Sequence, residues 1–140
     1  MGAVLRILVV DDDPVAVQLA RAAARSAFPM AEVDAAASAE EGVAALRRRD
    51  YDAILADMHM SRATGIDLLE IAERERPRAV RVLVTGEGTP TLAHEALRRA
   101  RIHAFVPKGG APSPVTRTRT ARGRSRSAIS SRSMPVARDM

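Results

Sequence analysis

The sequence predicts an α/β protein with a parallel sheet in its first 108 residues. Short apolar runs, rich in β-branched residues, alternate five times with longer segments of helical apolar spacing. The links between them are short, which favours parallel strands joined by right-handed crossovers. Several of the apolar runs also end directly on a polar residue, which is typical of strands that deliver side chains to one edge of a sheet.

Each apolar run is interpreted as a strand, and most are apolar enough to be buried on both faces of the sheet. The first run ends in three consecutive acids and the third in a single acid. We expect strands over Leu5–Val10, Ala31–Ala36, Ala53–Ala56, Ala79–Val84 and Ile102–Val106.

Four amphipathic helices are expected between these strands. Asp13 precedes a proline and suits the N-cap of the first helix, in which Val15 and Leu19 share one apolar face. Ser38 and Glu41 fit a capping box at the second helix. We expect helices over Val15–Ala27, from the Ser38 cap to about Arg49, over Gly65–Arg76 and over Thr91–Ala100.

The charge of the chain is divided at Lys108. Up to that residue there are 15 lysines and arginines against 16 acids, and from Gly109 onward there are seven arginines against one acid. The basic segment is rich in Arg, Ser, Thr and Pro and has no helical apolar spacing, so we expect it to be disordered. The sequence therefore predicts a domain at residues 1–108 and a tail at residues 109–140.

A fifth helix would be expected after the last strand, covering the sheet face that the first helix also covers. The tail has no pattern for such a helix, so several apolar side chains of that face are expected to meet water. The chain has no cysteine and no apolar run of about 20 residues. We expect a cytoplasmic protein with no disulfide, thiolate metal site or membrane partner.

Four strands end on polar residues that a parallel sheet brings to one edge: Asp11-Asp12, Asp57, Thr85 and Lys108. Three carboxylates at one place repel one another unless a cation or protons are present. An all-oxygen group suits Mg²⁺. Together with a lysine and a hydroxyl, it suits the transfer of a phosphoryl group to Asp57 as nucleophile.

The motifs ILVVDDDP, DAILADMHM, VLVTG and FVPK, at this spacing, resemble the receiver domain of bacterial two-component response regulators, and the chemotaxis receivers among them. The resemblance covers Arg6 to Lys108. It implies a flavodoxin-like doubly wound sheet of strand order 2-1-3-4-5. It also implies a signalling phosphoacceptor, which is not an enzyme beyond its own Mg²⁺-dependent phosphotransfer and dephosphorylation.

The resemblance further implies roles for individual residues. Asp57 corresponds to the phosphoacceptor, and Asp11 and Asp12 to the acidic pair that holds Mg²⁺ with it. The backbone carbonyl of His59 corresponds to a further protein contact to the metal. The chain departs from the family at Gly109, where proline usually follows the lysine.

The remaining implied roles concern switching and partners. Thr85 corresponds to the switch hydroxyl, Lys108 to the lysine that pairs with the phosphoryl group, and Phe105 to an aromatic residue that turns inward as Thr85 moves. A histidine kinase or phosphotransfer protein would donate the phosphoryl group. A downstream protein would then bind the face of the fourth helix and fifth strand.

Other interpretations remain open. Asp57 alone could cap a loop, Thr85 could simply end a strand, and Phe105 could be an ordinary core residue. The chain could be a receiver-like binding module, phosphorylated weakly or not at all, whose basic tail contacts nucleic acid. It could also be a phosphatase-type hydrolase, although it has no room for a cap. The tail could equally be inert, or the product of a frameshift in a GC-rich gene.

Overall fold

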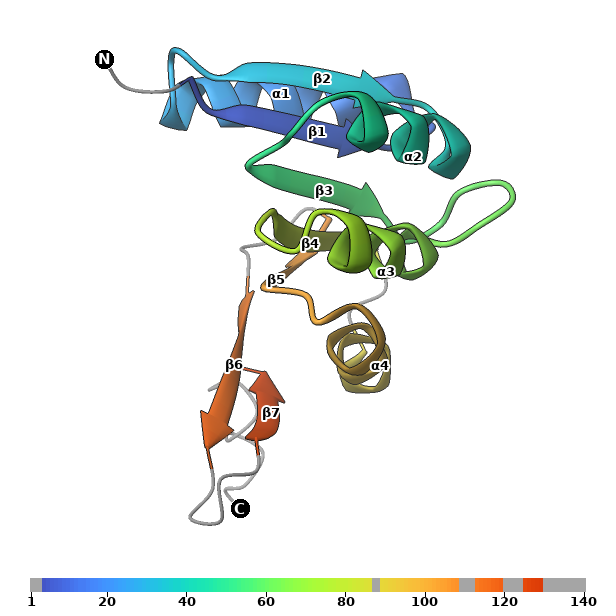
Figure 1. Cartoon of the computed structure of the whole chain (residues 1–140), viewed down its shortest axis with the longest axis vertical. Helices are drawn as coiled ribbons and strands as arrows, with labels where there is room; N and C mark the ends of the chain where they lie inside the picture. The colour runs from blue at the N-terminus through green and yellow to red at the C-terminus, as the bar shows by residue number, and fades with distance from the viewer. Residues whose placement is uncertain (1–3, 87–88, 109–112, 120–124, 130–140) are drawn as a thin grey trace.

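The computed structural model describes residues 4–86 and 89–108 and, in two further strands, residues 113–119 and 125–129. Five parallel strands have the order β2-β1-β3-β4-β5, as predicted, and helices lie on both faces of their sheet (Figure 1). These strands are β1 (Arg6–Val10), β2 (Glu32–Ala36), β3 (Ala53–Asp57), β4 (Val80–Thr85) and β5 (Ala104–Pro107).

Four helices connect the strands, and side chains cap their first turns. Asp13 Oδ1 accepts a hydrogen bond from Val15 N–H, and Ser38 Oγ accepts one from Glu41 N–H. Glu41 Oε1 accepts a hydrogen bond from Ala37 N–H. A capping box would instead have it accept from the N–H of Ser38, the next residue. The helices are α1 (Pro14–Ala27), α2 (Ala39–Arg48), α3 (Gly65–Glu75) and α4 (Pro90–Ala100).

The last parallel strand begins two residues later than predicted. Arg101 ends α4 in the left-handed conformation, at φ 50°. Ile102 is buried in the core but precedes the strand, which starts at Ala104. The predicted strand therefore included the turn that brings the chain from α4 back to the sheet.

The main core lies between the sheet and three helices, α2, α3 and α4, which cover one of its faces. Leu8, Ile54 and Leu83 of the three central strands are fully buried there against Ile66 and Leu69 of α3. Burying side chains of this size stabilises the fold by roughly 1.5–3 kcal/mol each. This core fixes the three central strands, whose carboxyl ends carry the predicted acids and Thr85.

The opposite face is covered by α1 alone (Figure 1). Val17, Ala20 and Ala24 of this helix pack on the sheet, whereas Val15 and Leu19 are 64% and 67% exposed. Val15 and Leu19 thus face away from the sheet, and they stay exposed because no helix among the described residues lies beside α1. They border an apolar groove of about 950 Å³ over β1, β3, β4 and β5.

Where a fifth helix would begin, the described backbone forms two strands instead. β6 (Ser113–Arg119) pairs antiparallel with β5, and β7 (Ser125–Ile129) pairs antiparallel with β6. This hairpin extends away from the parallel sheet in Figure 1. Residues 109–112, 120–124 and 130–140 of the tail predicted to be disordered lie outside the described residues.

Among the described residues, α-helices are too short or too polar to cross a lipid bilayer.

Candidate functional site

The predicted site residues lie together at the carboxyl edge of the parallel sheet. Asp11 follows β1, Asp57 ends β3, Thr85 ends β4 and Lys108 follows β5. The strand register brings these ends level, since Asp57 is aligned with Val84 of β4, next to Thr85. The central strands are packed into the main core, which holds the backbone that carries these side chains in place.

Three carboxylates gather at the centre of this edge. One oxygen from each of Asp11, Asp12 and Asp57 lies within 4.8 Å of the others. Asp11 and Asp57 are only 6% and 4% exposed, whereas Asp12 is exposed. Burial raises the pKa of Asp11 above its usual value, and the negative charge of Asp57 raises it further. The group is therefore electrostatically unfavourable without a cation.

Lys108 places one positive charge against these acids. Its Nζ lies 2.9 Å from Asp57 Oδ1 and 3.6 Å from Asp11 Oδ2. The hydrogen bond to Asp57 raises the pKa of Lys108, which keeps the ammonium group charged. Its backbone N–H donates to the Thr85 carbonyl at 2.8 Å, so the end of β4 holds this residue in place. Gly109, the departure from the family pattern, lies outside the described residues.

The donor set fits a small divalent cation. All three groups are carboxylates, with an exposed one beside two buried ones, which leaves a side open to water. Mg²⁺ prefers such oxygen ligands and retains several waters. One lysine cannot balance three carboxylates, so a divalent ion would complete the charge of the site.

Thr85 and Phe105 lie near each other but in different surroundings. Thr85 is fully buried at the edge of the sheet, and Phe105 is 4% exposed within the main core. Phe105 is aligned with Leu83 on the neighbouring strand, two residues before Thr85. The structure thus has Phe105 in a buried position.

The loop after Asp57 carries His59, whose side chain is exposed. His59 and Thr64 pair across this loop in an antiparallel bridge. Met58 N–H donates to the Val84 carbonyl at 2.8 Å, and Gly65 N–H donates to the Met58 carbonyl at 3.1 Å. The loop is therefore tied at both ends, to β4 and to the start of α3.

Gly65 is a site residue that the sequence analysis did not single out. A Cβ at this position would lie 2.5 Å from the Asp57 carbonyl oxygen and 2.9 Å from Leu83 Cδ1. The absence of a side chain lets α3 begin directly against the backbone of Asp57. A glycine opening a helix just after a threonine N-cap is the only signal for this close approach in the sequence.

Comparisons with known proteins agree with this geometry. The profile of the response regulator receiver domain matches residues 7–117. No curated protein matches the chain. Among solved structures, a CheY-like response regulator receiver domain protein from Methanospirillum hungatei is 29% identical, with a TM-score of 0.67, covering 78% of this chain and 85% of that chain.

Two further structures share the fold at lower identity. The response regulator TrrA from Thermotoga maritima, in complex with Mg²⁺ and BeF, is 24% identical, with a TM-score of 0.65 over 75% of this chain and 87% of that chain. A Burkholderia pseudomallei response regulator with a phosphorylated aspartic acid and a calcium ion is 23% identical, with a TM-score of 0.68 over 76% and 61% of the two chains. The family profile matches most of this chain, and three acids and a lysine meet at one edge of its sheet. The chain therefore belongs to the response regulator receiver family.

Proposed function

We propose that this receiver domain accepts a phosphoryl group on Asp57 in the presence of Mg²⁺ and thereby switches its binding to a partner protein. Receiver domains pair with histidine kinases, and a histidine kinase or phosphotransfer protein is the proposed donor. A receiver is a signalling phosphoacceptor and not an enzyme in the usual sense. Its proposed location is the cytoplasm.

The contact between Lys108 and Asp57 is the observation that carries this proposal. Lys108 Nζ lies 2.9 Å from Asp57 Oδ1. At this distance the ammonium group can neutralise negative charge on the oxygens of a phosphoryl group bound to Asp57. An isolated carboxylate capping a loop would have no need for a lysine held at the end of β5, two strands away in the sheet. The Burkholderia relative, whose structure contains a phosphorylated aspartic acid, supports the same chemistry.

In the proposed reaction, an oxygen of Asp57 attacks the phosphorus of a phosphohistidine. A phosphorus–oxygen bond forms as the phosphorus–nitrogen bond breaks, and the histidine leaves. Lys108 holds its proton throughout and stabilises negative charge on the transferred group. Hydrolysis of the resulting acyl phosphate by water would restore Asp57.

Asp11, Asp12 and Asp57, with the backbone carbonyl of His59, are the proposed metal contacts. Mg²⁺ bound there would neutralise charge on the phosphoryl oxygens. The acidic group supports this assignment, as does the Thermotoga relative, which was solved as a complex with Mg²⁺ and BeF.

Thr85 and Phe105 are the proposed switch. Movement of the Thr85 hydroxyl toward a phosphorylated Asp57 would vacate space beside β5, which Phe105 could occupy by changing its rotamer. The face of α4 and β5 would then change shape for a downstream protein. Such a switch is a local change of charge acting on an element with two arrangements.

The test is phosphorylation of the full chain by acetyl phosphate, measured by intact-mass spectrometry as added phosphate. We expect incorporation with Mg²⁺, loss of it with a chelator, and none in the Asp57→Asn variant. Asp13→Asn is the matched control, because Asp13 caps α1 at the same edge without belonging to the acidic group. Equal incorporation in the Asp57→Asn variant would reject Asp57 as the acceptor.

A second candidate follows from the charge of the tail. Seven arginines against one acid after Lys108 would attract nucleic acid in a salt-dependent way. The affinity of the full chain for duplex DNA at rising salt tests this, with a chain ending at Lys108 for comparison. Equal, weak binding by both chains would exclude the tail as a nucleic-acid contact.

A further inference from the structure

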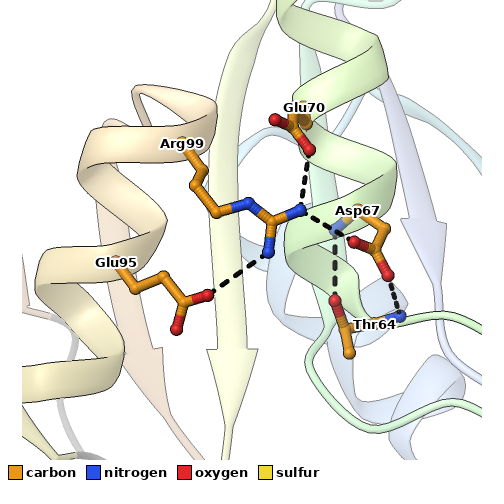
Figure 2. Close-up of polar contacts among 5 residues, drawn as sticks. All are labelled: Thr64, Asp67, Glu70, Glu95 and Arg99. Carbon is orange, nitrogen blue, oxygen red and sulfur yellow. Dashed lines mark hydrogen bonds and ion pairs between the residues drawn. The ribbon is translucent and has the colours of Figure 1, made fainter.

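One arginine of α4 gathers three carboxylates at its junction with α3 (Figure 2). Arg99 Nη2 lies 2.8 Å from Asp67 Oδ1 and 2.7 Å from Glu70 Oε1, and its Nη1 lies 3.3 Å from Glu95 Oε2. The Arg99 side chain is 28% exposed, so these bonds are partly shielded from water. Three acids around one guanidinium would repel one another if the cation were removed.

Asp67 differs from the other two acids because it also caps α3 (Figure 2). Its Oδ2 accepts a hydrogen bond from Thr64 N–H at 3.0 Å, and its own N–H donates to Thr64 Oγ1 at 3.2 Å. The Thr64 backbone bond, followed by the Arg99 bond, lowers the pKa of Asp67 and keeps it ionised. One carboxylate thus holds α4 with one oxygen and the start of α3 with the other.

Thr64 in turn closes the loop that follows Asp57. It pairs with His59 across that loop, and the next residue, Gly65, donates to the Met58 carbonyl. A continuous path of short contacts therefore runs from Arg99 through Asp67 and Thr64 to the residue whose carbonyl is the proposed metal contact. Each step is a hydrogen bond, an ion pair or a backbone bridge between described residues.

We propose that Arg99 is a positioning residue that fixes the loop of residues 58–64 through Asp67 and Thr64, and so couples α4 to the metal site. This inference rests on the proposed function. Without the guanidinium, Asp67 is crowded by Glu70 and turns toward water, which loosens its bond to Thr64. By linkage, anything that moves α4 and Arg99 changes metal affinity, and metal binding favours the present position of α4.

The test compares Arg99→Met with Glu95→Gln. Methionine keeps an apolar stem on α4 without the charge, and Glu95→Gln weakens a bond of the same arginine without touching the α3 cap. We expect Arg99→Met to weaken Mg²⁺ binding, measured by titration calorimetry, by about tenfold. Amide exchange at Thr64, measured by NMR, should accelerate by about the same factor, whereas Glu95→Gln should change both by no more than about twofold.

A double-mutant cycle with Asp67→Asn separates this role from a general loss of stability. An asparagine can still accept the Thr64 hydrogen bond but makes no ion pair with Arg99. If Arg99 acts through Asp67, Arg99→Met has no further effect on Thr64 exchange in the Asp67→Asn background. Full additivity of the two changes would overturn the inference.

The two proposals fail in different ways. A wild-type chain that binds no Mg²⁺ and takes up no phosphoryl group contradicts the proposed function. Unchanged Thr64 exchange and Mg²⁺ affinity in folded Arg99→Met contradict the role of Arg99, even when the wild type is phosphorylated.

Discussion

At the acidic edge of the sheet, the chain uses a lysine where it otherwise uses arginine. Lys108 is the single lysine among 22 lysine and arginine residues. A compact ammonium group can lie between Asp57 and Asp11 and still leave room for a ligand, whereas a planar guanidinium would occupy both acids as a fork. Arginine serves elsewhere, as at Arg99, where one side chain bonds several carboxylates at once.

The ionisation of Tyr51 can be followed by itself in the ultraviolet spectrum, because it is the only tyrosine and the chain has no tryptophan. Its hydroxyl donates to Asp34 Oδ2 at 2.6 Å, and burial together with this bond raises its pKa to about 12. The raised pKa means that this stabilisation is present below pH 10 and is lost as the pH rises toward about 12.

We therefore expect alkaline ultraviolet titration to show one tyrosine ionising near pH 12, and the free energy of unfolding to fall over the range from pH 10 to 12. The Tyr51→Phe variant should lack that part of the fall. Titration in concentrated urea is the control, where the same residue should ionise near its usual value of about 10. A native titration near that value would contradict the buried hydrogen bond.

At the scale of elements, the start of α3 is the most constrained junction with the site. Gly65 lies so close to the Asp57 carbonyl that an added methyl group would displace backbone and not merely a side chain. Gly86 follows β4, and a Cβ added at this residue would meet no other atom within 4 Å. The two glycines therefore form a matched pair on either side of the site.

We expect Gly65→Ala to reduce the free energy of unfolding by about 1–3 kcal/mol, because it forces the end of β3 and the start of α3 apart. The same shift should lower phosphoryl incorporation by moving Asp57. Gly86→Ala should change stability by no more than about 0.5 kcal/mol. Chemical denaturation and the acetyl phosphate assay measure both effects; equal behaviour of the two variants would argue against the close contact.

The contacts of Arg81 in β4 could not be predicted from the sequence. Arg81 interrupts an apolar strand in the sequence, yet it is only 4% exposed. Its guanidinium donates to the carbonyls of Pro77, Ala79, Ala100 and Arg101. Such a cage needs the end of α4 beside the start of β4, and this proximity exists only once the sheet has formed.

At the scale of the whole molecule, the two faces of the sheet are unequal. One face is covered by three helices and holds the main core, and the other is covered by α1 beside an apolar groove. The free energy of folding should therefore depend mainly on the first face. Leu8 is fully buried on that face, and Leu19 is 67% exposed beside the groove.

We expect Leu8→Ala to cost about 2–5 kcal/mol of stability and Leu19→Ala to stay within about 0.5 kcal/mol. Equilibrium unfolding in urea measures both changes on the same scale. A large loss for Leu19→Ala would show that another segment or molecule covers the groove in solution.

Much of this architecture follows from the sequence because strands buried on both faces produce unmistakable apolar runs. The ends of those runs placed Asp57, Thr85 and Lys108 correctly at one edge. An apolar stripe on a helix, however, tells only which side is apolar, so Val15 and Leu19 gave no sign that they lie exposed. The Arg99 contacts require two helices to be neighbours, which spacing within either helix does not encode.

The single lysine has a practical consequence for labelling. Reagents that couple to amines can react only with the chain's α-amino group and with Lys108, which is 39% exposed. Molecules attached to a sensor surface through Lys108 would lose the cation that contacts Asp57, whereas molecules attached through the α-amino group would keep it.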